Sequence, residues 1–171
     1  TMIRMLEDIT HFDAQQVPLD DQSVMSLFKS TEALGITPED IEGCAAWEGV
    51  ELKERDCVLL RCGEHWPEMD RCPGAGMTLA AARYLVEEKG AVLLGDDMIA
   101  FEMNHADGTM SWPRHPHPVH HYCLTQQGVH FMEAVQLDEL AKDKTYEFCF
   151  MLASNKIKGA TGMFIRPLAI C

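Results

Sequence analysis

The chain has 171 residues, and its content of 47% hydrophobic and 8% aromatic side chains is that of a globular protein rather than a disordered one. Its 27 acidic residues outnumber the 14 basic ones, and the resulting formal charge of −13 excludes a general affinity for the phosphate backbone of nucleic acids. The longest apolar runs are far shorter than the roughly 20 residues that span a bilayer, and residues 1–20 lack the pattern of a signal peptide, so we expect a cytoplasmic protein without membrane contact.

The first half of the sequence predicts a β-α-β element. TPEDIEG offers a threonine cap followed by a proline and predicts a short helix at 37–43. The apolar run CVLL predicts a buried strand at about 57–62. TLAAARYLVEEKG, which ends at Gly90, predicts a helix at 79–89, and AVLLG predicts a second buried strand at 91–95.

The second half predicts a long irregular loop followed by a helix and three strands. The helix is expected at about 118–127, where Gly128 ends it, and the strand VHFMEAV follows. Two further strands, YEFCFML and MFIRPLAI, flank NKIKGATG. The GATG at 159–162 predicts a tight turn, because it lacks the lysine and helix of a phosphate-binding loop. We expect one domain over residues 1–171.

Seven cysteines form an odd set with irregular spacing and no CxxC pair. This pattern favours reduced thiols in a cytoplasmic protein over a disulfide framework. Most of the cysteines lie in apolar runs, and we expect them to act as packing residues.

The stretch HPHPVHHYCLTQQGVHFME, residues 115–133, holds five of the eight histidines and ends on a carboxylate. His117 and His121 are four residues apart, a spacing that allows chelation from one helix face. The prolines on either side of His117 place His115 and His117 on extended backbone ahead of the helix. Solvated or hydrogen-bonded imidazole is the alternative interpretation for His115, His117 and His130.

Four segments, VLLRCG, AAARYLVEEKGAVLLGDD, HPVHHYCLTQQGVHFMEAVQLDELA and FCFMLASNKIKGATGMFIRPLAI, together resemble a known family. In order, they are similar to the carboxyl-terminal half of the cyclase family of metal-dependent hydrolases, which includes bacterial kynurenine formamidase and isatin hydrolase. The resemblance runs from about residue 36 to 170. It implies an α/β fold, the swivelling β/β/α domain with a mixed sheet and few helices, here incomplete at its N-terminus. It also implies hydrolysis of amide or lactam bonds with zinc or manganese, and assembly as a homo-oligomer.

The resemblance also assigns site residues. In this family a histidine at the start of a helix is followed twelve residues later by a glutamate, and the matching pair here is His121 and Glu133. Glu133 is thereby implied as a metal ligand, and His121 as either a ligand or a catalytic proton-transfer group. An exposed strand carboxylate is the alternative interpretation for Glu133.

One departure from the family is large. The main metal-binding motif, H-x-G-T-H-x-D, has no counterpart, since His11 and Asp13 have similar spacing without the G-T-H context. We therefore expect a fragment, one subunit of a split enzyme whose other chain carries the missing ligands, or a non-catalytic binding or assembly subunit that keeps the fold. A small independent zinc protein that uses only the histidines of 115–133 is a further hypothesis.

A small-molecule amide substrate would contact side chains around the metal. His65 and Trp66, just past a strand end, are placed to stack on an aromatic substrate, and half-buried surface positions explain them equally well. Trp112 is a similar candidate, for which the surface position is slightly favoured. Asp96 and Asp97 follow the strand at 91–95, at the end where α/β sheets bind ligands, but turn capping is the favoured role for both.

Overall fold

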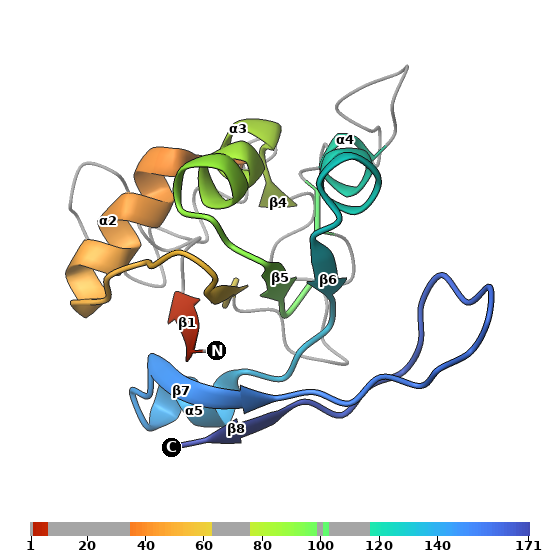
Figure 1. Ribbon diagram of the computed structural model, residues 1–171. Coiled ribbons are helices and arrows are strands. Elements are labelled where there is room, and N and C mark those ends of the chain that lie inside the picture. Colours follow the sequence, from red (N-terminus) through yellow and green to blue (C-terminus); the bar gives the residue numbers. More distant parts are fainter. Residues whose placement is uncertain (1, 7–34, 63–75, 99–100, 103–116) are drawn as a thin grey trace, which may run out of the picture.

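A six-stranded mixed sheet is the centre of the fold (Figure 1). The computed structural model describes residues 2–6, 35–62, 76–98, 101–102 and 117–171. Its strand order is β6-β5-β3-β1-β7-β8. The bounds of these strands are Met2–Leu6 for β1, Cys57–Leu60 for β3, Leu93–Asp96 for β5, His130–Met132 for β6, Glu147–Met151 for β7 and Leu168–Ile170 for β8. A separate parallel pair joins β2 (Gly35–Ile36) to β4 (Gly76–Met77).

The sheet divides into a parallel and an antiparallel part. The neighbours β1, β3, β5 and β6 all pair in parallel, whereas β7 is antiparallel to β1, and β8 to β7. Parallel neighbours need long crossover connections, usually helical, and the helices above the sheet in Figure 1 lie in these crossovers. They are α2 (Pro38–Glu48), α3 (Leu79–Arg83) continued by the π-helix η2 (Tyr84–Glu88), and α4 (Pro118–His120) continued by the π-helix η3 (His121–Gln127).

Local capping residues explain where these helices begin and end. The Thr37 hydroxyl accepts a hydrogen bond from the Asp40 amide, and the Asp40 carboxylate accepts one from the Thr37 amide, which together cap the start of α2. Left-handed Gly49 and Gly128 end α2 and η3. The predicted mixed α/β fold with few helices is confirmed. The predicted helix at 37–43 is too short, because its sequence continues to a glycine stop at 49.

One predicted strand is shorter than expected, and one helix was not predicted. VHFMEAV forms strand only over β6, because Ala134 takes a positive φ of 53° directly after Glu133. A five-residue helix, α5 (Asp138–Lys142), lies between the strand VHFMEAV and the strand YEFCFML, where no helix was predicted. Gly159, with a φ of 82°, lies in a turn within the predicted GATG region. The predicted long loop after β5 lies mostly outside the described residues.

Side chains alternate across β3 and build a core on each face of the sheet. Val58 and Leu60 face the helices, in a cluster with Ile41 and Leu85. Cys57 and Leu59 face the opposite side, in a second cluster that includes residues of β6, β7 and α5. A strand covered on both faces has no polar alternation, which explains the continuous apolar run CVLL.

The cysteines of the described residues form no disulfide bond. Six cysteines, all except Cys72, fall within them, and all six are free thiols, four buried and two exposed. None of the described helices is long and apolar enough to cross a membrane.

Close packing at Gly95 generates a prediction for stability. A Cβ atom there would lie 2.5 Å from Cδ2 of buried Leu59 and 3.3 Å from the carbonyl oxygen of Met132. We expect Gly95→Ala to lower the free energy of unfolding by about 1–3 kcal/mol, measured by chemical denaturation, because overpacking strains a filled core.

Gly162→Ala is the matched control for this change. A Cβ atom at residue 162 would have no other atom within 4 Å. We expect its unfolding free energy to equal that of the unchanged chain within about 0.5 kcal/mol. Equal stability of the two alanine variants would contradict the packing argument.

Candidate functional site

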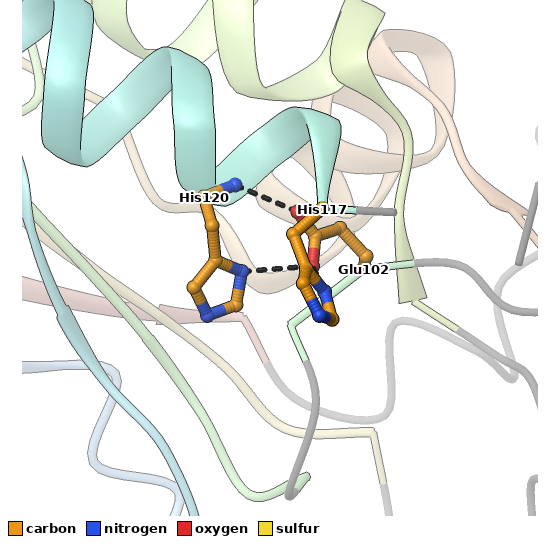
Figure 2. A group of neighbouring side chains, drawn as sticks. All are labelled: Glu102, His117 and His120. Carbon is orange, nitrogen blue, oxygen red and sulfur yellow. Dashed lines mark hydrogen bonds and ion pairs between the residues drawn. The ribbon is translucent and has the colours of Figure 1, made fainter. Parts of the chain in front are cut away.

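Two carboxylates and two histidines meet at the carboxyl ends of β5 and β6. Glu133 directly follows β6, and Glu102 forms a parallel bridge to Met77 at the end of β4. His117 and His120 lie at the start of α4, with His117 at the N-cap position (Figure 2). Glu133 is placed by the end of β6, Glu102 by its bridge to β4, and the two histidines by the start of α4, so the fold brings these four residues together from distant parts of the chain.

Glu102 is the centre of this group. Its side chain is only 2% exposed, and it accepts hydrogen bonds from the backbone amide and Nδ1 of His120, at 2.7 and 2.8 Å. Nδ1 of His117 lies 3.0 Å from the same carboxylate. Burial acts to raise the pKa of Glu102, but the hydrogen bonds from His120 and His117 outweigh it and lower that pKa. A buried carboxylate is thus held charged.

Glu102 also explains the local start of α4. Pro118 occupies the first helical position, where its missing N–H is no loss, and the side chain of His117 makes no capping bond. The amide of His120 belongs to the unpaired first turn, and Glu102 accepts its hydrogen bond from outside the helix. The same carboxylate therefore caps the start of α4 and forms part of the site.

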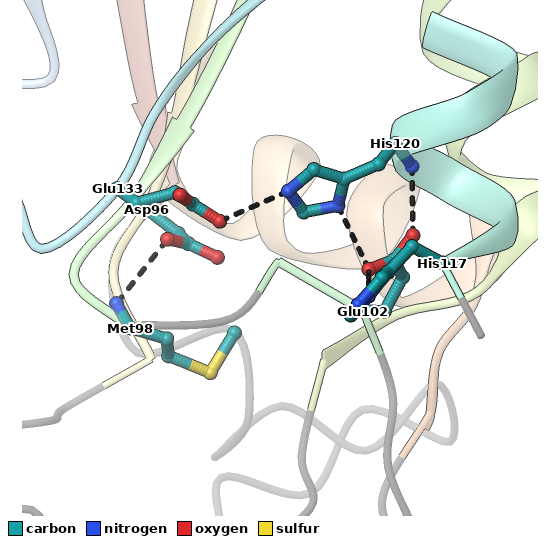
Figure 3. A network of polar contacts seen from close by, with 6 residues as sticks. All are labelled: Asp96, Met98, Glu102, His117, His120 and Glu133. Carbon is teal, nitrogen blue, oxygen red and sulfur yellow. Dashed lines mark hydrogen bonds and ion pairs between the residues drawn. The ribbon is translucent and has the colours of Figure 1, made fainter. Parts of the chain in front are cut away.

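His120 is held between two carboxylates (Figure 3). Nδ1 contacts Glu102, and Nε2 lies 3.3 Å from Oε1 of Glu133. Hydrogen bonds to Glu102 and then to Glu133 raise the pKa of His120 to about 9. The ring also packs edge-on against Phe131 at a centroid distance of 4.9 Å. These contacts fix the orientation of the imidazole.

The donor atoms of this group are suited to a cation. Glu102, His117 and His120 each offer one ligand atom, and these atoms all lie within 4.8 Å of one another, so the cluster could hold a metal ion. Imidazole nitrogen and carboxylate oxygen together suit zinc or manganese.

The predicted residue Glu133 lies in this site, whereas His121 lies outside the cluster. The side chain of His121 is exposed, and the neighbouring His120 faces Glu133 instead. Successive helical residues point about 100° apart, so only one of the two adjacent histidines can face the sheet edge. The ring of His117 lies beside that of His120, at a ring-centroid distance of 5.4 Å, and both rings contact Glu102. His65, Trp66 and Trp112 lie outside the described residues.

Sequence reasoning missed Glu102 and His120. Glu102 stands in AFEMN, a segment interpreted as irregular loop, and its signal was a single carboxylate next to an apolar run. His120 was missed because the adjacent His121 was chosen in its place.

Asp96 has the predicted role of turn capping, whereas Asp97 bonds to a residue 35 positions away and does not cap a local turn. Asp96 is buried, and its Oδ1 accepts a hydrogen bond from the Met98 amide at 3.2 Å, as Figure 3 shows. Oδ1 of Asp97 accepts one from the Cys62 amide at 2.7 Å. The Asp97 bond ties the turn after β5 to Cys62, two residues after the end of β3.

Comparison with known proteins identifies a family. The family described as "Putative cyclase" matches residues 8–103. This match begins earlier than the resemblance seen in the sequence and ends before His117, His120 and Glu133.

Solved structures of this fold are also similar. A novel cyclase has a TM-score of 0.73 at 23% identity, over 99% of this chain and 52% of its own. Isatin hydrolase A from Labrenzia aggregata has a TM-score of 0.63 at 21% identity, over 98% and 59%. A potential metal-dependent hydrolase with cyclase activity has a TM-score of 0.60 at 18% identity, over 98% and 63%. The chain spans about half to two thirds of these structures, and at these identities they show its fold.

Short likenesses to another class of protein also occur. The PolC-type DNA polymerase III of Caldanaerobacter subterraneus subsp. tengcongensis is 61% identical over 41 residues, which are 24% of this chain and 3% of the polymerase. That of Latilactobacillus sakei subsp. sakei is 48% identical over 50 residues, 29% and 4% of the two chains. The chain spans a few per cent of these relatives, too little to place it in their family.

The raised pKa of His120 predicts how metal-free stability depends on pH. The folded pKa of about 9 exceeds the ordinary value of 6.5, so the charged ring contributes stability fully below pH 6.5 and loses it as the pH rises through about 9. In the presence of a chelator, we expect the unfolding free energy of the unchanged chain to fall across this window relative to that of His120→Gln. Parallel curves for the two proteins would contradict the paired imidazolium.

Proposed function

The chain belongs to the cyclase family, and from this membership and the geometry of the site we propose that it is a metal-dependent hydrolase of amide or lactam bonds in a small molecule. The observation that carries the proposal is the imidazole of His120, oriented by buried Glu102 so that Nε2 faces Glu133 at 3.3 Å. A histidine that binds a metal usually donates its other ring N–H to a carboxylate, which fixes its tautomer.

The proposed ligands from this chain are Nε2 of His120 and the carboxylate of Glu133. Their side chains are 28% and 36% exposed, so water and substrate can reach them, whereas that of Glu102 is 2% exposed. Glu102 already accepts from three nitrogens, and we assign it the orienting role. A zinc site takes about four ligands, so the others would come from polypeptide outside the described residues. When bound, a zinc or manganese ion supplies a water of lowered pKa and polarises the substrate carbonyl.

The reaction adds water across the C–N bond. The water oxygen bonds to the carbonyl carbon, the C–N bond breaks, and the nitrogen leaves with one of the two water protons; the other is released to solvent, giving a carboxylate and an amine. We assign His117 as the group that moves the proton to the nitrogen, because its side chain is 50% exposed while Nδ1 stays anchored on Glu102. The proton-transfer role expected of His121 thus passes to a residue at the cluster, and its ligand role to His120.

Removal of Glu133 tests the metal site. We expect Glu133→Gln to lower the affinity for zinc and manganese by more than about 100-fold, because it removes a metal ligand. Glu102→Gln should lower it by about 10- to 100-fold, because it removes the group that orients the ligand His120. Isothermal titration with each metal measures both.

Glu139→Gln is the matched control for metal binding, since Glu139 is an 86% exposed carboxylate on nearby α5. Asp138 is unsuitable, because it pairs with Arg61 at 3.0 Å. Equal metal affinity of the Glu133 and Glu139 variants would overturn the ligand assignment.

A panel of aryl formamides and cyclic amides, followed by acid release, tests the reaction in the metal-loaded protein. Metal-dependent hydrolysis that falls at least about tenfold in His117→Asn would support the proposal. Metal binding without turnover of any amide would favour a non-catalytic binding subunit.

A further inference from the structure

A short turn follows β5 and is fixed at both of its ends. Asp96, the last residue of β5, is 1% exposed, and its Oδ1 accepts a hydrogen bond from the Met98 amide at 3.2 Å. The side chain of Met98 is 3% exposed and packs in the core cluster on the helical side of the sheet. Residues 96–98, which we call the β5 turn, therefore have little freedom to move.

Two backbone hydrogen bonds join the β5 turn to the chain that leaves β6. The amide of Ala134 donates to the carbonyl oxygen of Met98 at 2.7 Å. The amide of Val135 donates to the carbonyl oxygen of Asp96 at 2.9 Å. Glu133 lies between β6 and these two bonds, and Figure 3 shows it beside the turn. The backbone of Glu133 is thus held from both directions.

The backbone conformation directly after Glu133 is one that alanine rarely adopts. Ala134 has a φ of 53°, in the left-handed region that glycine favours. Its side chain is exposed, so packing of the methyl group does not hold it there. Such strain persists only where the surrounding structure imposes it, and the hydrogen bonds to the β5 turn impose it here. The resulting bend ends β6 and leaves the Glu133 carboxylate 3.3 Å from Nε2 of His120.

We propose that Asp96 is a positioning residue for the metal site: its buried carboxylate sets the β5 turn, and the turn aims Glu133 at the metal that it shares with His120. This role rests on the proposed function, in which Glu133 is a metal ligand. Asp96 acts through the backbone of residues 133–135 and is not itself a ligand.

Amide hydrogen exchange in the metal-free chain tests the first half of the proposal. Asp96→Ala should speed exchange at the two amides that bond to the β5 turn at least about tenfold more than at the amide of Leu59, which lies in the central strand β3 and reports global unfolding. Asp96→Asn keeps an oxygen that can accept from the Met98 amide, so exchange should stay within about threefold of that of the unchanged chain. Equal acceleration at all three amides in Asp96→Ala would overturn the proposal.

Zinc affinity, measured by isothermal titration of the full chain, tests the second half. Asp96→Ala should lower this affinity about tenfold, and Asp96→Asn should restore it. Combined with Glu133→Gln, Asp96→Ala should cause no further loss, because it acts only through that ligand. A purely structural role would lower the affinity equally in both backgrounds, and that result would overturn the proposal.

Asp56→Ala is the matched control. Asp56 is also a buried carboxylate, 5% exposed, and it caps a turn by accepting from the Lys53 amide at 2.8 Å. It lies directly before β3, at the opposite end of the parallel strands from the site. Its replacement should lower stability without changing the zinc affinity, and equal losses of affinity in the Asp56 and Asp96 variants would overturn the proposal.

Ala134→Pro provides the same test if Asp96→Ala does not fold. Proline removes both the hydrogen bond to Met98 and the positive φ at an exposed position, so the zinc affinity should fall about tenfold. Ala134→Gly keeps both and should bind zinc as the unchanged chain does. Unchanged affinity in Ala134→Pro would overturn the positioning role and leave the proposed function intact. Unchanged affinity in Glu133→Gln would instead overturn the proposed function, and the positioning role with it.

Discussion

The contact between buried Glu102 and the two histidines of α4 is the constraint on which the site depends. A charged carboxylate removed from water needs several donors, and three nitrogens from His117 and His120 supply them. The same bonds begin α4, orient the imidazole of His120 and present its second nitrogen to Glu133. Helix position, ring orientation and charge therefore have one cause.

Much of the fold was predictable because its signals are local. Thr78 and Gly128 mark helix ends through backbone geometry that few other residues satisfy, and CVLL marks a strand with both faces covered. The two-residue strands β2 and β4 and the short helix α5 were not predicted. Elements this short owe their form to tertiary contacts, which a local pattern does not record.

The site was predictable only in part. Glu133 was found through its spacing from the histidine-rich stretch, but the spacing was counted to His121, and one residue on a helix changes the face. Glu102 was not predicted, because its importance comes from a bridge to Met77 and from burial beside α4. Nothing within a few residues of Glu102 in the sequence indicates either contact. The substrate contacts expected from His65, Trp66 and Trp112 stay predictions.

The bridge between Glu102 and Met77 has a mechanical meaning. Glu102 is fastened to the two-stranded sheet through β4, while Glu133 follows β6 of the six-stranded sheet. His120 contacts both Glu102 and Glu133, so its ring connects the two-stranded sheet to the six-stranded sheet. In the described chain, these two sheets share few other hydrogen bonds. A sliding of one sheet past the other would strip the imidazole of one carboxylate and lower its proton affinity. The relative position of the two sheets and the protonation of the His120 ring are thus linked.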